Sequence, residues 1–360
     1  MRAAVARIAC FAAATSALAA LALIFVTTRG NAATVGKSSV VVVKTAPVAS
    51  VQDLKALYRR PDSIPFPKDN PYTLEKVTLG KKLYFDTRLS AANILSCASC
   101  HNPAYGWGDG LPKGIGHNMK ELGRRSPTIV NAAFGQAFMW DGRASSLEQQ
   151  ALGPIAAEVE MNVPIEQLIA KLERIPEYPP LFRAAFPKEE LMPTSVARAI
   201  ATYERTVVSR RAPFDAWVEG DETAIPADAK RGFVLFNTKA ACANCHSGWN
   251  FTDDSFHDIG LADGDIGRGK FLPNVIKMAH AFKTPGLREI TRRGPYMHDG
   301  SVPTLGAVMD HYSNGGIDRP SRSDQVKPLR LSKQESDDLV AFMQTLTSDL
   351  EPTAVPILPR

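Results

Sequence analysis

The chain has 360 residues, a formal net charge of +5, 44% hydrophobic residues and five cysteines. Three of the positive charges, Arg2, Arg7 and Arg29, lie at the extreme N-terminus, and no basic run interleaved with aromatic residues points to nucleic acid. The length is sufficient for two domains of ordinary size.

An apolar run at residues 8–26 follows the basic start. This order is typical of a secretory signal peptide, so we expect residues 1–33 to be removed and the mature protein to be exported. The run is also long enough to remain as an uncleaved membrane anchor. Residues 34–50 are expected to form a flexible leader. Because Cys10 lies in the signal, the other four cysteines decide the chemistry.

Two Cys-x-x-Cys-His motifs contain these four cysteines. The motif is the attachment signature of c-type haem, in which both sulfurs bond to the haem and the histidine becomes an axial iron ligand. The predicted attachment cysteines and proximal ligands are Cys97, Cys100, His101, Cys242, Cys245 and His246. Two matches predict two covalent haems and exclude a disulfide framework or a thiol nucleophile. Haem is attached to such motifs after export, so we expect a periplasmic protein.

A glycine followed by bulky apolar residues precedes each motif, at 80–85 and at 232–236. This pattern is typical of the first helix of a cytochrome c fold, in which glycine allows a second helix to approach closely. Apolar residues at helical spacing predict the partner helix of the first domain, with Val196, Ile200, Tyr203 and Val207 on one face. In the second domain a capping box at 332–335 precedes Leu339, Phe342, Met343 and Leu346.

We therefore predict a mainly α fold with two cytochrome-c-like haem domains and long irregular loops. The helical pattern is interrupted near 210–226, which gives a first domain at 51–210 and a second at 211–350. The Pro-rich end at 352–360 is expected to be a loose tail. A minimal cytochrome c core needs roughly a hundred residues, so the first domain has room for more than an electron carrier requires.

Further segments between and after the haem motifs carry specific patterns. They are Phe138–Arg143 with Trp-Asp-Gly-Arg, Gln149–Pro154, Val159–Met161, Phe282–Arg288 and Pro295–Gly300. In this order and spacing, from about residue 79 to 346, the chain resembles the bacterial di-haem cytochrome c peroxidases and their MauG-type relatives. The resemblance covers nearly all of the expected mature chain.

The resemblance implies that the haem at His101 reacts with peroxide. Glu160 would be the distal carboxylate that moves protons, Gln150 an amide that hydrogen-bonds peroxide, and Pro154 a wall of the same pocket. Trp140 would lie between the haems and relay electrons. The alternative readings are a solvated charge for Glu160, a surface amide for Gln150 and a packed aromatic for Trp140, and without the resemblance the solvated charge is the better reading of Glu160.

His117, in the Gly-rich loop 114–118, matches a histidine that caps the first haem of oxidised peroxidases in the family. A lone loop histidine is otherwise an ordinary exposed side chain. We therefore keep both readings of His117, as a distal ligand of the first haem and as a solvent-exposed residue.

The second haem has an unusual candidate on its distal face. The peroxidase branch places Met fourteen residues after the histidine that matches His298, whereas this chain has Tyr312 there, as MauG-type proteins do. A phenolate favours higher oxidation states than a thioether does. Met309, one turn earlier on the same helix face, is the alternative ligand, and a ligand elsewhere stays open. We expect His311 at the surface and His298 to be structural or to contact a haem propionate.

The family often holds Ca²⁺ between its domains, but the matching positions here carry cations. Arg125 stands where the resemblance expects an Asn ligand, and Arg293 provides a backbone carbonyl partner. Two positive side chains disfavour Ca²⁺, although the carbonyls of Arg293 and Pro295 leave it open. An arginine that replaces the charge of the ion is the alternative hypothesis.

Three functions follow from this reading. The first is a periplasmic di-haem c-type peroxidase that reduces hydrogen peroxide at the N-terminal haem, with electrons from a small cytochrome c or cupredoxin relayed through the C-terminal haem. The second is a MauG-like enzyme whose peroxide-derived high-valent haems oxidise a side chain of a protein substrate. The third is a non-catalytic di-haem electron-transfer cytochrome. His117 favours the first and Tyr312 the second, and the resemblance also implies a homodimer.

Overall fold

The computed structural model describes residues 50–349 and 352–360. The predicted signal peptide or anchor and all but the last residue of the leader therefore lie outside the described residues. The α-helices are α1 Val51–Ala56, α2 Leu74–Phe85, α3 Cys97–Cys100, α4 Leu147–Ala156, α5 Ile165–Glu173, α6 Tyr178–Ala185, α7 Pro193–Arg205, α8 Pro213–Val218, α9 Ala227–Asn237, α10 Leu305–Asn314 and α11 Lys333–Gln344.

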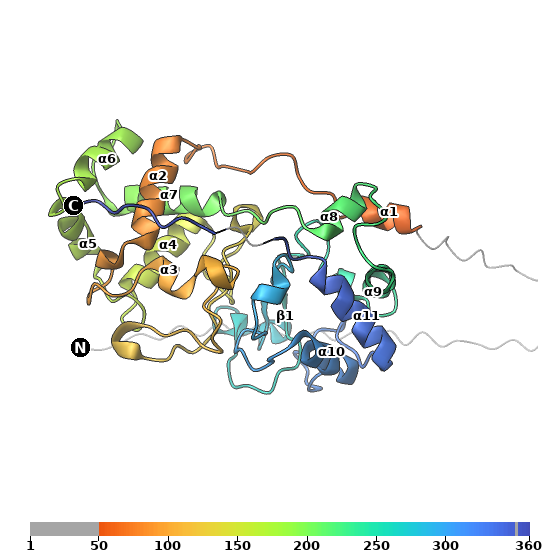
Figure 1. Ribbon diagram of the computed structural model, residues 1–360. Helices are drawn as coiled ribbons and strands as arrows, with labels where there is room; N and C mark the ends of the chain where they lie inside the picture. The colour runs from red at the N-terminus through yellow and green to blue at the C-terminus, as the bar shows by residue number, and fades with distance from the viewer. Residues whose placement is uncertain (1–49, 350–351) are drawn as a thin grey trace, which may run out of the picture. The chain divides into compact units, whose positions relative to one another are not determined.

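The fold is mainly α with long irregular loops, as predicted (Figure 1). Two short strands, β1 (Phe256–His257) and β2 (Phe282–Lys283), pair antiparallel. None of the helices in the described part of the chain is long and apolar enough to cross a bilayer. Two hydrophobic clusters form, one around α2 and α7 and one around α9 and α11.

The first core is organised by the close contact of α2 with α7. A Cβ on Gly80 would lie 2.0 Å from the carbonyl oxygen of Ala199, so only glycine permits this approach. Val196, Ile200 and Tyr203 are buried on the facing side of α7. The predicted glycine contact and the predicted partner helix are therefore confirmed, except that α7 ends at Arg205 and Val207 is buried just beyond it.

The second core repeats this contact with α9 and α11. A Cβ on Gly232 would lie 2.0 Å from the carbonyl oxygen of Asp338. Ser332 and Glu335 form the predicted capping box at the start of α11. Phe342 is fully buried and packs edge-on against Phe233 of α9, with ring centroids 5.6 Å apart. Both halves of the molecule thus use one plan.

The N-terminal segment packs on the second core, although it precedes the first core in the chain. Tyr58 is 1% exposed and stacks on Phe251, with centroids 4.9 Å apart. Lys55 lies over the ring of Trp217 at 4.4 Å and pairs with Glu222 at 2.8 Å. The ranges 51–210 and 211–350 stay predictions, and α1 contributes to the core of the later one.

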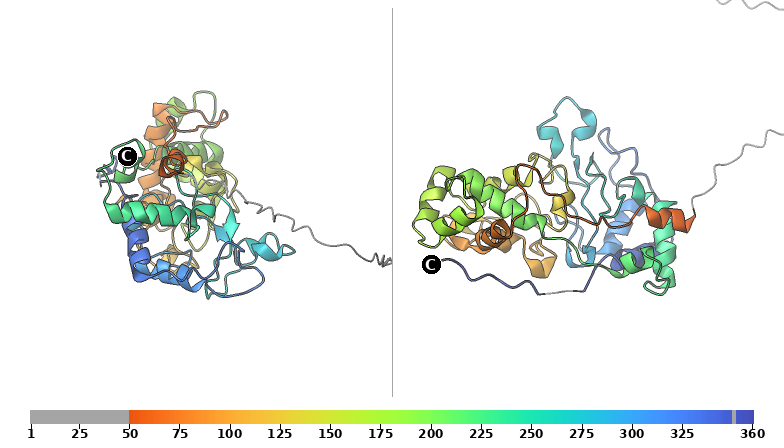
Figure 2. Two further views of the ribbon diagram at one scale, coloured as in Figure 1. Left: turned by 90° about the vertical axis from the view of Figure 1, so that its right-hand side faces the viewer. Right: turned by 90° about the horizontal axis from the view of Figure 1, so that it is seen from above.

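The Pro-rich end 352–360 is not loose, contrary to expectation. It runs back along the first core and ends beside α5 and α6 (Figure 1, Figure 2). Arg88 donates to the carbonyl oxygen of Pro359 at 2.8 Å, and the backbone N–H of Arg360 donates to Glu177 at 3.0 Å. Composition alone suggested mobility, but the extended segment finds polar partners on the first domain.

The glycine contact gives a stability prediction. Gly232→Ala should lower the free energy of unfolding by about 1–3 kcal/mol or more, because the added methyl overpacks the α9–α11 interface. Gly306→Ala is the matched control, since Gly306 is exposed in α10 and its Cβ would meet nothing closer than 3.8 Å. The control should gain about 0.5–1 kcal/mol. Urea unfolding of the haem-loaded proteins measures both, and equal midpoints would refute the close-contact argument.

Candidate functional site

Each histidine of the Cys-x-x-Cys-His motifs is half-buried, and a backbone hydrogen bond fixes its ring. His101 follows α3 and donates from Nδ1 to the carbonyl oxygen of Pro127 at 2.8 Å. His246 donates from Nδ1 to the carbonyl oxygen of Phe251 at 2.9 Å. Burial lowers the pKa of both imidazoles, which keeps them neutral. The neutral rings therefore keep Nε2 for a metal, the usual arrangement of an axial ligand.

The cysteines of both motifs are compatible with haem attachment. Within the described residues they form no disulfide. Burial raises the pKa of Cys97 and raises that of Cys100 to about 11, so neither is an activated thiolate nucleophile. Cavities lined largely by apolar side chains border both histidines. The motifs, the fixed imidazoles and the apolar cavities together fit covalently bound haem.

His101 borders two adjoining cavities. The distal cavity contains Gln150, Pro154 and Glu160, and the junction cavity lies between the two cores. The structure thus brings all three residues predicted for the peroxide site to one place near His101. Gln150 and Pro154 come from α4, and Glu160 comes from the turn that follows it.

Glu160 has the electrostatics of a proton-holding group. Burial raises the pKa of its carboxyl, and the charge of Arg143 offsets part of that effect. The Gln150 amide makes one weak contact, from Nε2 to the sulfur of Met139 at 3.8 Å. Both groups are thus available to a small molecule in the distal cavity.

Glu204 provides a second carboxyl in the distal cavity, and no sequence pattern predicted it. Glu204 lies on α7 and is 4% exposed, and its Oε2 has no hydrogen-bond partner within the described residues. Burial raises its pKa to about 8, against an opposing effect of Arg205. The sequence offered one weak signal, since the neighbouring Tyr203 lies on the predicted buried face and a fully buried glutamate is unusual.

His117 lies next to the distal cavity but does not line it in this conformation. Its backbone N–H donates to the carbonyl oxygen of Val159 at 3.1 Å, beside Glu160. The preceding Gly116 does border the cavity, and a Cβ there would lie 1.9 Å from the Val159 carbonyl oxygen. The loop is therefore attached to the Glu160 turn, and ligation by His117 stays a prediction.

Trp140 borders both the junction cavity and the cavity at His246. Its Nε1 donates to the carbonyl oxygen of Arg125 at 2.8 Å, which fixes the indole. It packs edge-on against His298, with ring centroids 6.3 Å apart. His298 is buried, stacks on Phe282, and lies 3.2 Å from Asp263. This placement is consistent with a structural role for His298.

The tryptophan and this histidine occupy equivalent places in a duplicated hairpin. Met139 and Gly142 have left-handed φ values of 68° and 66°, and Met297 and Gly300 have 70° and 67°. The bridges Phe138–Ala144 and Tyr296–Val302 close the two turns alike. The Met-x-Asp-Gly pattern shared by both turns was a signal of this repeat. The residues at its x position, Trp140 and His298, contact each other.

The cavity at His246 contains both candidate distal ligands. Met309 and Tyr312 of α10 line it together with His246. Burial raises the pKa of the Tyr312 phenol, and its hydroxyl makes no hydrogen bond within the described residues. His311 is not the free surface residue we expected, because it is half-buried and Nε2 bonds the carbonyl oxygen of Ile259 at 2.9 Å. That bond anchors α10 beside the cavity.

The residues at the expected Ca²⁺ position do not fit a metal ion. A guanidinium N–H of Arg125 donates to the carbonyl oxygen of Arg293, the group that would serve as a ligand. Both arginine side chains are buried at this place. A hard divalent cation requires several oxygen ligands and no adjacent positive charge.

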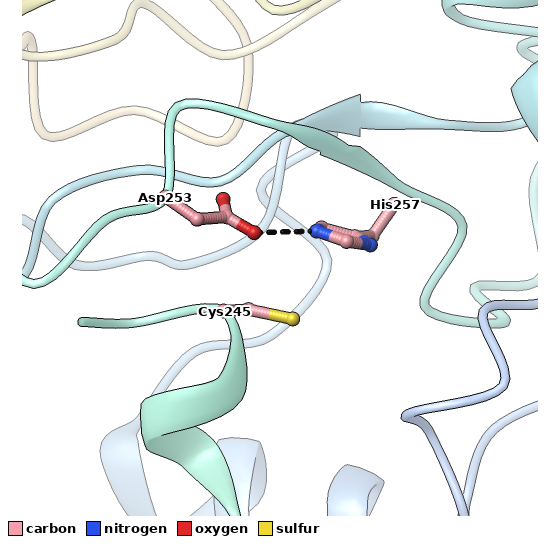
Figure 3. A group of neighbouring side chains, drawn as sticks. All are labelled: Cys245, Asp253 and His257. Carbon is pink, nitrogen blue, oxygen red and sulfur yellow. Dashed lines mark hydrogen bonds and ion pairs between the residues drawn. The ribbon is translucent and has the colours of Figure 1, made fainter.

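Cys245, Asp253 and His257 form a further group with metal-ligand spacing (Figure 3). His257 Nε2 lies 2.8 Å from the Asp253 carboxylate, and that interaction is the largest cause of a pKa of His257 raised to about 10. The sulfur of Cys245 belongs to the haem motif, and a thioether is a weak ligand. We therefore interpret Asp253 and His257 as an ion pair that fixes the loop after the motif.

Both halves of the chain match known families of haem proteins. Residues 74–223 match the family model of the di-haem cytochrome c peroxidases, and residues 229–347 match that of cytochrome c. The chain is 55% identical to the methylamine utilization protein MauG of Methylorubrum extorquens over 86% of this chain and 90% of that protein. The Methylophilus methylotrophus protein of the same description is 47% identical over 90% and 97%.

A peroxidase and a solved structure extend the likeness. Cytochrome c551 peroxidase of Pseudomonas aeruginosa is 33% identical over 83% of this chain and 86% of that protein. The crystal structure of a MauG-like protein associated with microbial copper homeostasis superposes with a TM-score of 0.75 at 30% identity. That superposition covers 81% of this chain and 95% of the other.

Glu204 gives a prediction on pH. Its folded-state pKa of about 8 exceeds the ordinary 4.5, so the folded protein holds a proton that the unfolded chain releases. Stability should therefore fall as the pH rises from about 4.5 to 8 and then level off. Glu204→Gln removes this dependence and should gain about 3–4 kcal/mol on wild type between pH 5 and 8.5. Urea unfolding at both pH values measures the difference.

The matched control for Glu204→Gln is Glu166→Gln, which changes an exposed carboxyl on α5. It should follow the pH profile of the wild type. A Glu204→Gln profile parallel to wild type would show that this carboxyl is ionised in the folded protein at neutral pH.

Proposed function

Because the chain belongs to the family of di-haem cytochrome c peroxidases and MauG proteins, we propose that it uses peroxide to oxidise a side chain of a protein substrate, as a MauG-type enzyme. The family makes it an oxidoreductase that acts on peroxide and carries two c-type haems, with His101 and His246 in the attachment motifs. The observation that carries the finer proposal is Tyr312, which lines the cavity at His246.

A tyrosine in that place suits an oxidising centre better than an electron-collecting one. A thioether stabilises the reduced iron of an electron carrier, whereas an anionic oxygen stabilises higher oxidation states. Burial opposes ionisation of the Tyr312 phenol, so the phenolate requires a nearby positive charge such as a bound ferric iron. Met309 shares the cavity, but α10 also presents Tyr312, the residue that the MauG branch has at this place.

The bound haems supply the redox chemistry by which peroxide takes up two electrons and two protons and leaves as two water molecules. The residues of the distal cavity manage the protons of that change. Glu160 takes a proton from one peroxide oxygen and returns it to the other, a task for which a raised carboxyl pKa is suited. The Gln150 amide donates a hydrogen bond that orients peroxide, and Pro154 narrows the space around it.

Trp140 connects the two sites. It borders the junction cavity and the cavity at His246, and its indole is fixed by the Arg125 carbonyl. An indole held between two redox centres shortens the distance of each electron step. This arrangement allows an oxidation that begins in the first domain to reach a substrate bound at the second.

Two relatives are methylamine utilization proteins, which supports a protein of methylamine utilization as the substrate. The second candidate function is reduction of peroxide with electrons from a small cytochrome c or cupredoxin. His117 favours it, because its loop is attached at Val159 beside Glu160 and could present a ligand to the first haem. Under either function, the haem attachment motifs support a periplasmic location for the mature protein.

Glu160→Gln should lower the rate of the peroxide reaction about 10²–10⁴-fold, because the isosteric amide cannot take up and return a proton. Stopped-flow absorption after peroxide addition measures the rate, and the haem content of the purified variant confirms that both haems remain attached. Glu158→Gln is the matched control, since Glu158 is an exposed carboxyl two residues away. A rate of Glu160→Gln within threefold of the control would remove Glu160 from the mechanism.

The fully oxidised protein decides between the two functions. If the proposed function holds, peroxide added without any reductant produces an oxidised state that persists for seconds and involves both haems. Tyr312→Phe should remove that persistence and change the spectrum of the second haem alone, while Met309→Leu leaves both unchanged. A protein that reacts with peroxide only after one haem is reduced would instead be a cytochrome c peroxidase. A spectrum altered by Met309→Leu alone would make Met309 the ligand.

A further inference from the structure

Two arginines lie buried at the junction of the cores without an acidic partner. Arg125 and Arg293 are 7% and 5% exposed. Within the described residues neither forms an ion pair, and the Nε atom of each is buried without a hydrogen-bond partner. Removing an unpaired charge from water costs several kcal/mol. The pair therefore calls for a negative charge that these protein residues do not supply.

Other buried arginines in the described chain have such a partner. Arg288, which is 1% exposed, lies 2.8 Å from the Asp215 carboxylate. Arg205, which is 7% exposed, lies 2.7 Å from the Glu148 carboxylate. Arg125 and Arg293 differ from them, because Asp109 and Glu289 act on these two only through their charge and form no ion pair with either within the described residues.

The two side chains are held by neutral backbone groups. A guanidinium N–H of Arg125 donates to the carbonyl oxygen of Arg293, and one of Arg293 donates to that of Gly286. Burial lowers the pKa of Arg125, and burial together with the charge of Arg125 lowers that of Arg293 to about 10. The carbonyls position the guanidinium groups but carry no charge, and the charges of Asp109 and Glu289 offset only part of the cost of burial.

Both arginines line the junction cavity together with His101 and Trp140. We propose that Arg125 and Arg293 bind the propionate carboxylates of the haem attached beside His101, and that their two charges take the place of a metal cation between the domains. Guanidinium groups bind carboxylates through paired, charge-assisted hydrogen bonds. Haem carries two carboxylates at one edge, which matches two positive charges in one cavity.

The proposal predicts a change in reduction potential. Arg125→Gln and Arg293→Gln should each lower the midpoint potential of the haem at His101, because losing a nearby positive charge favours the more positive, ferric state. The second haem should change less. A redox titration followed by the paramagnetic resonance signals of the two ferric haems measures each potential separately and does not depend on peroxide turnover.

Arg183→Gln is the matched control, since it removes a positive charge from an exposed position on α6. It should leave both potentials unchanged. Potentials of both glutamine variants equal to that of the control, or equal shifts of the two haems, would overturn the proposal. If the glutamine variants fail to accumulate, Arg125→Lys retains the charge and loses the planar fork. It should then shift the propionate bending band in the resonance Raman spectrum, and an unmoved band counts against the proposal.

Metal analysis of the haem-loaded wild-type protein tests the second half of the proposal. The protein should contain iron without a stoichiometric divalent ion, and prolonged chelation should leave its unfolding midpoint and both potentials unchanged. One tightly held Ca²⁺ per chain would overturn the replacement of the cation by arginine.

Discussion

Each haem site depends on a hydrogen bond from an imidazole Nδ1 to a backbone carbonyl. Pro127 provides that carbonyl for His101, and Phe251 provides it for His246. The bond fixes both the ring and its tautomer, so that Nε2 is the atom left for iron. The segment that supplies the Pro127 carbonyl leads on to Trp140, so the first ligand and the link between the cavities are held by neighbouring parts of the chain.

The two halves are built alike but differ in what surrounds each histidine. Gly80 and Gly232 permit the same helix contact, and the same hairpin follows in each half. The first half adds α4 and the turn with Glu160, which give polar groups to the distal cavity. The second half places α10 beside its histidine instead. The two halves thus share a scaffold but differ in their proposed tasks. The first half handles the protons of peroxide, and the second shares the oxidising equivalents.

Local sequence patterns predicted much of the fold and the site. The haem motifs and the capping box at Ser332 each act within a few residues, so the sequence alone identifies them. The two glycines contact distant helices, but their place before each haem motif indicated those contacts. Glu204 could not be assigned, because its carboxyl matters only through the cavity that distant segments form around it. The position of His311 similarly depends on Ile259, far away in sequence. Tertiary contacts of polar groups carry no periodic signal.

The first and last segments of the described chain each pack on the domain that is farther away in sequence. Tyr58 completes the core of the later domain, and residues 357–360 cover the earlier one. During synthesis from the N-terminus, α1 therefore forms before the core that it packs on, and residues 357–360 reach the first domain only after the second domain has been made. Neither half is therefore independent of the other, because a cut at residue 210 would separate Tyr58 from the second core and residues 357–360 from the first.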